Sequence, residues 1–125
     1  MTKYQTTVTV PASGGANRIR LSTALLSAYS STFTSYGYTE DYFPCAKLFL
    51  QMATSSTGVG FVGDSTVTQT GTGGAIQLQP ATSATVPGAS FTYESKLDTN
   101  NVNLGDFYIH GTVSGDVMIV WVTEA

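Results

Sequence analysis

The stretch VMIVWV, residues 117–122, decides the fold, because it is the most apolar run in the chain. In a β-strand successive side chains point to opposite faces, so the odd-numbered residues of this stretch share one face and the even-numbered residues share the other. A strand with one face in water alternates apolar and polar residues, whereas this strand is apolar on both faces. We therefore expect both faces to be covered and Trp121 to be buried, mostly by the same chain and in part by another subunit.

A second strand is predicted just before this stretch. Residues 106–110 (DFYIH) are rich in strand-forming side chains, and residues 111–116 (GTVSGD) are typical of a turn. The two strands are therefore predicted to form a closing hairpin on which the other elements pack, with His110 at a strand end or an interface.

Short strand-like segments recur through the rest of the chain and are separated by turn residues. Residues 22–31 are ambiguous between a short helix with Ser22 as its N-cap and a further strand. About eight to ten short strands are typical of an antiparallel β-sandwich, of jelly-roll or immunoglobulin-like topology. The length of 125 residues suggests a single domain, with residues 1–10 as an N-terminal arm or edge strand. Besides the closing strands, the predicted strands span residues 4–10, 16–21, 45–52, 59–62, 65–70, 76–79 and 89–93.

Composition and charge narrow the functional classes. Only 10% of the residues are charged and the net charge is −3, so the clustered Lys and Arg of a nucleic-acid surface are missing. No run of about eighteen apolar residues predicts a membrane span, and residues 1–5 lack a signal-peptide core, so we expect synthesis and retention in a cytoplasm, at least initially. Cys45 is the only cysteine, which excludes an internal disulfide and favours a buried structural thiol.

The motif Gly63-Asp64-Ser65 is the strongest catalytic candidate, because it resembles the nucleophile block of the serine hydrolases named for that tripeptide. In those enzymes the Asp and His come from a D-x-x-H block, whereas Asp106 and His110 are separated by three residues here. A triad is recognised by mutual geometry, so we interpret the motif as a turn between strands. We therefore expect no enzymatic activity.

Metal and cofactor sites are also disfavoured. His110 is the only histidine, which excludes a site with several histidine ligands. Oxygen ligands for calcium are present near residue 100, but the spacing lacks the Gly and the distal Glu of a helix–loop–helix calcium loop, so a turn is favoured. We expect no cofactor. The calcium candidates are Asp98, Asn100, Asn101 and Asn103.

Residues 33–43 form an aromatic, loop-like stretch that is the candidate contact surface. Exposed tyrosines in a loop are effective contact residues, because they bury a large area at low entropic cost. The alternative, equally supported, is that these rings pack over an open end of the sandwich. The candidate interface residues are Tyr36, Tyr38, Tyr42 and Phe43.

The second half of the chain, roughly residues 58–122, resembles small virion proteins of tailed bacteriophages, in particular head decoration (cement) proteins. The resemblance consists of strands and turns in a characteristic order: a strand with a Val-Gly turn, a polar strand, a Pro-Gly turn, the strand DFYI and a closing Gly-Asp hairpin. The segments that carry it are Val59–Gly63, Val67, Ile76–Leu78, Val86–Ser90, Leu104–Ile109 and Val117–Trp121.

This resemblance implies a β-sandwich without catalytic residues that binds between subunits of the major capsid protein and stabilises the phage head. It implies a homo-oligomer, with a homotrimer favoured, on the capsid surface of a virion assembled in the host cytoplasm. No nucleic acid or membrane partner is expected. The alternative is a carbohydrate-binding or receptor-binding β-sandwich module of a phage tail or fibre, which a planar face of exposed aromatic side chains would indicate.

Overall fold

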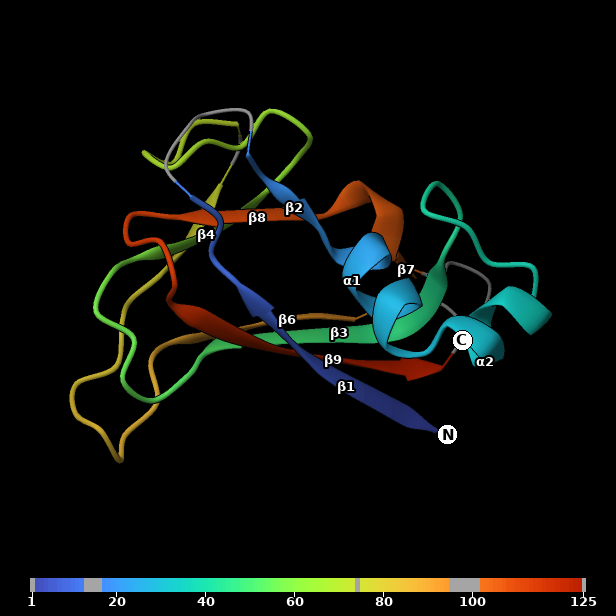
Figure 1. Ribbon diagram of the computed structural model, residues 1–125, viewed down its shortest axis with the longest axis horizontal. Coiled ribbons are helices and arrows are strands. Elements are labelled where there is room, and N and C mark those ends of the chain that lie inside the picture. The colour runs from blue at the N-terminus through green and yellow to red at the C-terminus, as the bar shows by residue number, and fades with distance from the viewer. Residues whose placement is uncertain (1, 13–16, 74, 95–101, 125) are drawn as a thin grey trace.

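The computed structural model describes residues 2–12, 17–73, 75–94 and 102–124, which form two antiparallel sheets packed face to face (Figure 1). The strands are β1 (Lys3–Thr9), β2 (Ile19–Arg20), β3 (Pro44–Met52), β4 (Gly60–Gly63), β5 (Ile76–Leu78), β6 (Ser90–Glu94), β7 (Val102–Asn103), β8 (Tyr108–Gly111) and β9 (Val117–Glu124). The helices are α1 (Leu21–Ala28), α2 (Ser30–Ser35) and the 3-10 turn η1 (Leu104–Asp106). Sheet A has the order β1-β9-β3-β6, with β7 also paired to β3, and sheet B has the order β2-β8-β4-β5. The predicted all-β sandwich is confirmed.

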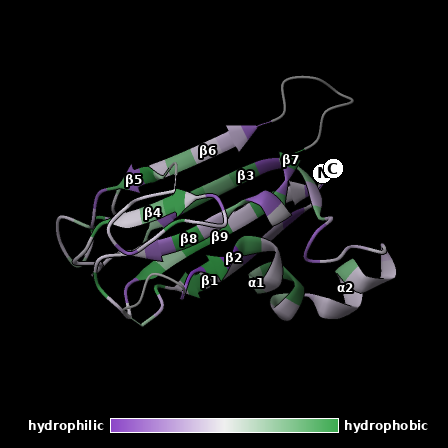
Figure 2. Cartoon of the chain, turned by 90° about the horizontal axis from the view of Figure 1, so that it is seen from above, coloured by the Kyte–Doolittle hydropathy of each residue, from purple (hydrophilic) through white to green (hydrophobic). Residues whose placement is uncertain are grey.

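The core lies between the two sheets and is built around β9, which pairs with β1 on one side and β3 on the other. Met118, Val120 and Val122 of β9 are at most 1% exposed and belong to the same buried cluster as residues of sheet B. Figure 2 shows the hydrophobic residues along β3 and β4 that contribute to this cluster. Its central members are Met118, Val120, Val122, Leu48, Leu50, Val62 and Ile109.

The other face of β9 does not follow the prediction. Val117, Ile119 and Trp121 point away from sheet B and stay partly exposed. Their neighbours on this face are side chains of the same sheet, with Gln5 and Phe49 directly opposite Trp121. Within the described residues, the prediction that Trp121 is buried and that the same chain covers most of this face is therefore wrong. Cover of this face by another subunit stays a prediction. Apolar periodicity reports how apolar a face is, and it does not report whether another layer covers it.

The predicted closing hairpin is also wrong, because β8 belongs to sheet B and β9 to sheet A. The chain crosses between the layers at Asp116, which is 8% exposed. Its carboxylate accepts hydrogen bonds from the backbone N–H groups of Gly58 at 2.7 Å and Thr57 at 3.2 Å, and its carbonyl accepts one from Val10 at 2.7 Å. These bonds fix the crossing to segments next to β1 and β4, so the two strands diverge into different sheets.

The ambiguous segment 22–31 is helical. Leu21, predicted to lie in a strand, is the first residue of α1 and is fully buried with Leu25. Ser22 is not the N-cap, because the cap position is Arg20. The buried Ser22 hydroxyl instead donates to the backbone carbonyl of Glu40 at 2.8 Å. This bond ties α1 to the aromatic stretch, whose first residues form α2 and not the predicted loop.

Residues 65–70, predicted as a strand, form a loop that covers part of sheet B. Asp64 Oδ1 accepts from the backbone N–H of Thr66 at 2.7 Å, and the Thr68 hydroxyl bonds locally as well. Such short-range bonds compete with strand pairing. Gly71, at φ +91°, lies against the Phe61 ring on the outer face of sheet B, where a Cβ atom would come within 2.7 Å of the ring. In the part of the chain that the structure describes, this loop covers the outer face of sheet B, whereas no segment covers the outer face of sheet A.

The remaining strand predictions agree with the structure to within one residue at each end for β1, β3, β4, β5 and β6. Only Ile19 and Arg20 of the predicted strand 16–21 are in β2. Within the predicted N-terminal segment 1–10, Lys3–Thr9 form β1, an edge strand of sheet A, with Lys3 opposite Thr123. The turn predicted at residues 98–101 lies outside the described residues.

Cys45 lies at the beginning of β3 and is 1% exposed, which confirms the predicted buried thiol. Burial raises the pKa of this thiol to about 12. The thiolate fraction of the folded protein is therefore very small near neutral pH, and thiolate is the reactive form.

We predict that 5,5′-dithiobis(2-nitrobenzoic acid) fails to modify Cys45 in the native protein at about pH 8 and modifies it after unfolding. The unfolded thiol loses its proton near pH 8.5, well before the folded one, so the free energy of unfolding should fall as the pH rises from about 9 to about 12. Urea denaturation at about pH 8 and about pH 10 measures this fall, which should be smaller in Cys45→Ala. Native labelling as fast as labelling in urea would contradict the prediction.

Candidate functional site

An aromatic cluster lies at the end of the sandwich where α2 meets sheet A. Phe33 of α2 is 2% exposed and forms the centre of the cluster. Its ring centroid lies 4.6 Å from that of Phe43, 4.7 Å from that of Tyr4 and 5.9 Å from that of Tyr29. All three contacts are edge-to-face, which is a preferred arrangement of aromatic rings. Phe33 and Phe43 thus give the surface rings a packed support.

We call Tyr36, Tyr38 and Tyr42 the tyrosine cluster. Tyr36 and Tyr38 contact the Phe33 ring, and Tyr42 contacts Tyr38. Ring centroids are 5.6 Å apart for Tyr36 and Tyr38 and 6.2 Å apart for Tyr38 and Tyr42. Tyr36 is 48% exposed and Tyr42 is 61% exposed, whereas Tyr38 is half-buried between them. The structure therefore brings the predicted tyrosines together. Phe43, predicted with them, is 1% exposed and belongs to the core, so it supports the cluster from below.

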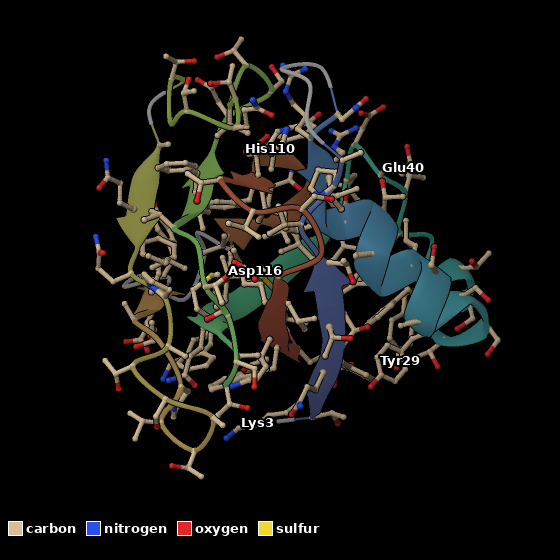
Figure 3. All side chains as sticks on the ribbon, turned by 60° about the vertical axis from the view of Figure 1, so that its left-hand side comes forward. Lys3, Tyr29, Glu40, His110 and Asp116 are labelled. Atoms are coloured by element: carbon tan, nitrogen blue, oxygen red, sulfur yellow. The ribbon has the colours of Figure 1, made fainter. Side chains whose placement is uncertain are left out.

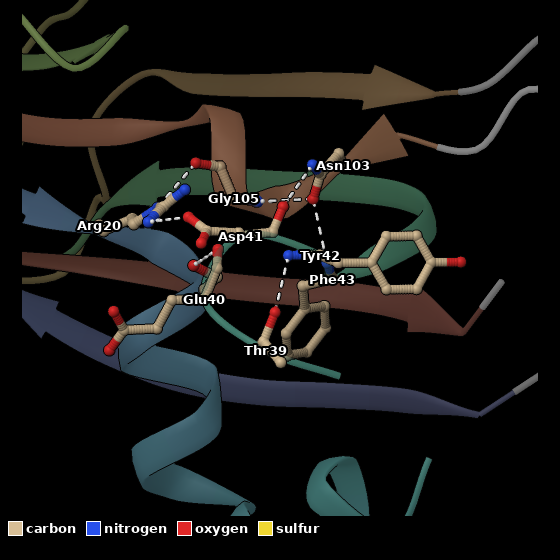
Figure 4. Close-up of polar contacts among 9 residues, drawn as sticks. Arg20, Thr39, Glu40, Asp41, Tyr42, Phe43, Asn103 and Gly105 are labelled. Carbon is tan, nitrogen blue, oxygen red and sulfur yellow. Dashed lines mark hydrogen bonds and ion pairs between the residues drawn. The ribbon is translucent and has the colours of Figure 1, made fainter. Parts of the chain in front are cut away.

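Polar contacts hold the segment that carries Tyr42 (Figure 4). Asn103 Oδ1 accepts from the backbone N–H groups of Phe43 at 3.0 Å and Gly105 at 3.1 Å, and its amide donates to the carbonyl of Asp41 at 2.9 Å. Arg20 donates through Nε to the carbonyl of Gly105 at 2.8 Å and forms an ion pair with the Asp41 carboxylate at 3.0 Å. These bonds connect β2, β7 and η1 to the aromatic segment and fix its position.

Asn103 appeared in the sequence only as a calcium candidate, and its structural role was missed. The side-chain oxygen and the side-chain amide of Asn103 both bond to the backbone of the segment 41–43, so this residue positions that segment. Asp98, Asn100 and Asn101 lie outside the described residues. The bond of Asn103 to Gly105, two residues on, is an N-cap of η1, and an Asn before a turn is a local signal for such a cap. Its bonds to Phe43 and Asp41 give no local signal, because these partners are some sixty positions away.

Tyr38, at the centre of the tyrosine cluster, stays a neutral phenol near pH 7. Burial raises the pKa of Tyr38, and the nearby Glu124 carboxylate raises it further. The pKa of Tyr4 is raised mainly by its hydrogen bond with Tyr36. A neutral phenol both donates and accepts hydrogen bonds, so each exposed tyrosine combines an apolar ring with a polar tip.

A second aromatic surface lies on the outer face of sheet A, which we call the open face. Trp121 stacks on Phe49, with ring centroids 4.8 Å apart and planes inclined by 18°. The Nζ atoms of Lys3 and Lys47 lie 4.9 and 5.8 Å from the Trp121 ring centroid, and Lys47 pairs with Glu94 at 3.6 Å. The sequence did not predict this surface, because the register that places Phe49 beside Trp121 depends on long-range pairing.

The other chemical candidates have structural roles. Gly63-Asp64-Ser65 is confirmed as a turn at the end of β4. His110 is fully buried in β8 opposite Phe61, so it lies neither at an interface nor at the surface. Within the described ranges, no three His, Cys, Asp or Glu side chains are grouped so that they could hold a metal ion. None of the helices described is long and apolar enough to span a membrane.

We predict that Asn103→Ala lowers the free energy of unfolding by about 1–3 kcal/mol, because it leaves backbone groups at Phe43 and Gly105 without their partner. Urea denaturation measures this loss. Thr34→Ala, an exposed change on α2, serves as the control and should shift stability by less than about 0.5 kcal/mol. An unchanged midpoint for Asn103→Ala would show that these bonds do not hold the segment.

Comparison of the chain with models of protein families found no match, and searches of curated proteins and of solved structures found none either.

Proposed function

We propose that the chain is a non-enzymatic virion protein of a tailed bacteriophage, a head decoration or cement protein that binds between subunits of the major capsid protein and stabilises the head. It acts as a homotrimer on the capsid surface, after assembly in the host cytoplasm, and needs no cofactor. The observation that carries this proposal is the tyrosine cluster, in which the exposed Tyr36 packs on the buried Phe33 and the exposed Tyr42 packs on Tyr38.

The geometry of the cluster suits a binding surface. Ordering side chains at an interface costs free energy, and rings already held in place lose less freedom on binding. Phe33 and Phe43 hold the rings from below, and Asn103 fixes the adjoining backbone. Exposed tyrosines supply large contact areas, and three copies in a trimer multiply weak contacts through avidity. The choice of a capsid as the partner comes from the sequence resemblance of residues 58–122, of which the strands β4, β5, β8 and β9 are present and the closing hairpin is not.

The test is co-expression with the major capsid protein encoded in the same genome, followed by sedimentation of the expanded capsids. We predict that the wild-type chain sediments with the capsids and that the double variant Tyr36→Ala, Tyr42→Ala binds at least about tenfold more weakly, because exposed tyrosines are frequent hot spots. Tyr93→Ala is the matched control, since Tyr93 is also 48% exposed but packs on Phe91 and Phe107. Tyr93→Ala should bind like the wild type.

Light scattering on the purified chain tests the oligomer, with an expected mass three times the 13.1 kDa of one chain. A chain that is monomeric and does not sediment with any of the expanded capsids tested would contradict the proposal. Equal losses in the double variant and in Tyr93→Ala would show that the tyrosine cluster is not the contact surface.

The open face favours a second candidate, a carbohydrate-binding module of a phage tail or fibre. Sugars pack on aromatic rings while neighbouring polar groups bond their hydroxyls. Trp121 and Phe49 supply the rings, and Gln5 and Thr92 lie opposite them in the same row of the sheet.

We predict for this candidate that a bound oligosaccharide quenches or shifts the fluorescence of Trp121, the only tryptophan of the chain. A glycan array supplies the ligands, and Phe49→Ala should weaken the binding of each hit. The double tyrosine variant should leave glycan binding unchanged, which separates the two candidates. An array without hits would eliminate this candidate.

A further inference from the structure

β1 is the longest edge strand among the described residues. Sheet A ends at β1 and β6, and sheet B ends at β2 and β5. β1 has seven residues, whereas β2, β5 and β6 have two, three and five. An edge strand presents unpaired N–H and C=O groups that can pair with a further strand, and short edges limit this pairing. β1 is therefore the edge with most room for an added strand.

The odd-numbered residues of β1 turn their backbone groups away from β9. The carbonyl of Thr2 accepts from the N–H of Glu124 in β9 at 2.9 Å, and the N–H of Val10 donates to the carbonyl of Asp116, the residue before β9, at 2.7 Å. The backbone groups of the even-numbered residues between them therefore point toward β9. Bonded and non-bonded pairs alternate along an antiparallel ladder. Thr7 and Thr9 therefore point their N–H and C=O groups outward.

At Gln5 a side chain already occupies the place of an added strand. The Tyr29 hydroxyl donates to the carbonyl of Gln5 at 2.6 Å and accepts from its N–H at 3.2 Å. Figure 3 shows Tyr29 at the end of α1, alongside β1. In the described part of the chain, no hydrogen bond reaches the outward backbone groups of Thr7 or Thr9. The edge is thus closed at one residue and open at the next two outward positions.

A groove of about 470 Å³ lies beside these open positions, between β1 and α1. Ligand sites typically have volumes of about 300–1,000 Å³. The wall formed by α1 carries the small side chains of Ala24, Ser27 and Ala28, so no bulky group fills the space next to the backbone of β1. Ile19 closes the groove toward sheet B and gives it an apolar floor.

We propose that this groove is a strand-addition site that binds an extended segment of another polypeptide. The segment pairs with the outward groups of Thr7 and Thr9, and its small or β-branched side chains face α1. Alternating donors and acceptors at two-residue spacing match a peptide backbone, which is how strand addition gives affinity. This site is separate from the tyrosine cluster and does not depend on the proposed capsid function.

A second copy of the chain fits this groove poorly. The added strand must offer one face to α1 of the first chain. If the added strand were β1 of a second copy, the face turned toward α1 would be the one that carries Val8. That face is not free, because Val8 is 4% exposed and packs in the core of its own subunit. A strand that belongs to no other sandwich has both faces free, so the occupant is an extended peptide segment.

The test uses a displayed library of random twelve-residue peptides, panned on the wild-type chain and measured with three variants. Thr7→Pro removes the outward N–H without breaking a bond to β9, since proline is tolerated on edge strands. We expect the recovered peptides to bind Thr7→Pro at least about tenfold more weakly and Thr7→Ala like the wild type. Tyr29→Phe exposes the backbone of Gln5 and should strengthen binding by lengthening the ladder.

Hydrogen exchange gives an independent measure, because the amides of Thr7 and Thr9 should become protected when a peptide binds. If Thr7→Pro fails to fold, Ala28→Trp fills the groove from the exposed side of α1 and should abolish binding. Peptides that bind Thr7→Pro as well as the wild type, or a library that yields no binder, would overturn the proposal. If the wild-type chain forms dimers and Thr7→Pro is monomeric, the proposal is also overturned, because the edge of β1 would then bind a second copy of the chain.

Discussion

The structure depends on β9, whose backbone pairs on both sides and whose even-numbered side chains from Met118 to Val122 form one wall of the core. Full burial of each such aliphatic side chain contributes about 1.5–3 kcal/mol, so Met118, Val120 and Val122 supply a large share of a marginal stability. β3 and β1 take their register from this strand. The positions of Phe49 beside Trp121 and of Thr7 at the free edge follow from it.

The two sheets differ in what covers their outer faces. The loop after β4 folds back over sheet B, so that Phe61 and His110 are buried on a face that would otherwise meet water. Sheet A has no such layer within the described residues, and Trp121 stays partly exposed. The surfaces that suit binding, namely the tyrosine cluster, the open face and the edge of β1, therefore all adjoin sheet A.

The alternation of residues in β1 and β3 predicted both strands closely, because period-two burial is a local property of the sequence. The aromatic stretch likewise predicted the position of Tyr36 and Tyr42. Partner choice was not predictable from such patterns. The turn before Asp116 reads as a hairpin until its bonds to Gly58 and Val10 are known, and these partners lie far away in the sequence. The role of Asn103 in holding the aromatic segment was missed for the same reason, since Phe43 and Asp41 lie some sixty positions away.

The pairing of β1 with β9 joins the first strand of the chain to the last one. During synthesis β1 leaves the ribosome long before its partner exists, and it must wait unpaired until β9 has emerged. Such non-local pairing also slows folding, because closing the long loop between the two strands costs entropy before any stabilising contact between them forms. Sheet A is therefore completed late in folding, when β9 inserts between β1 and β3. Until then β1 is exposed and can pair with strands of other chains.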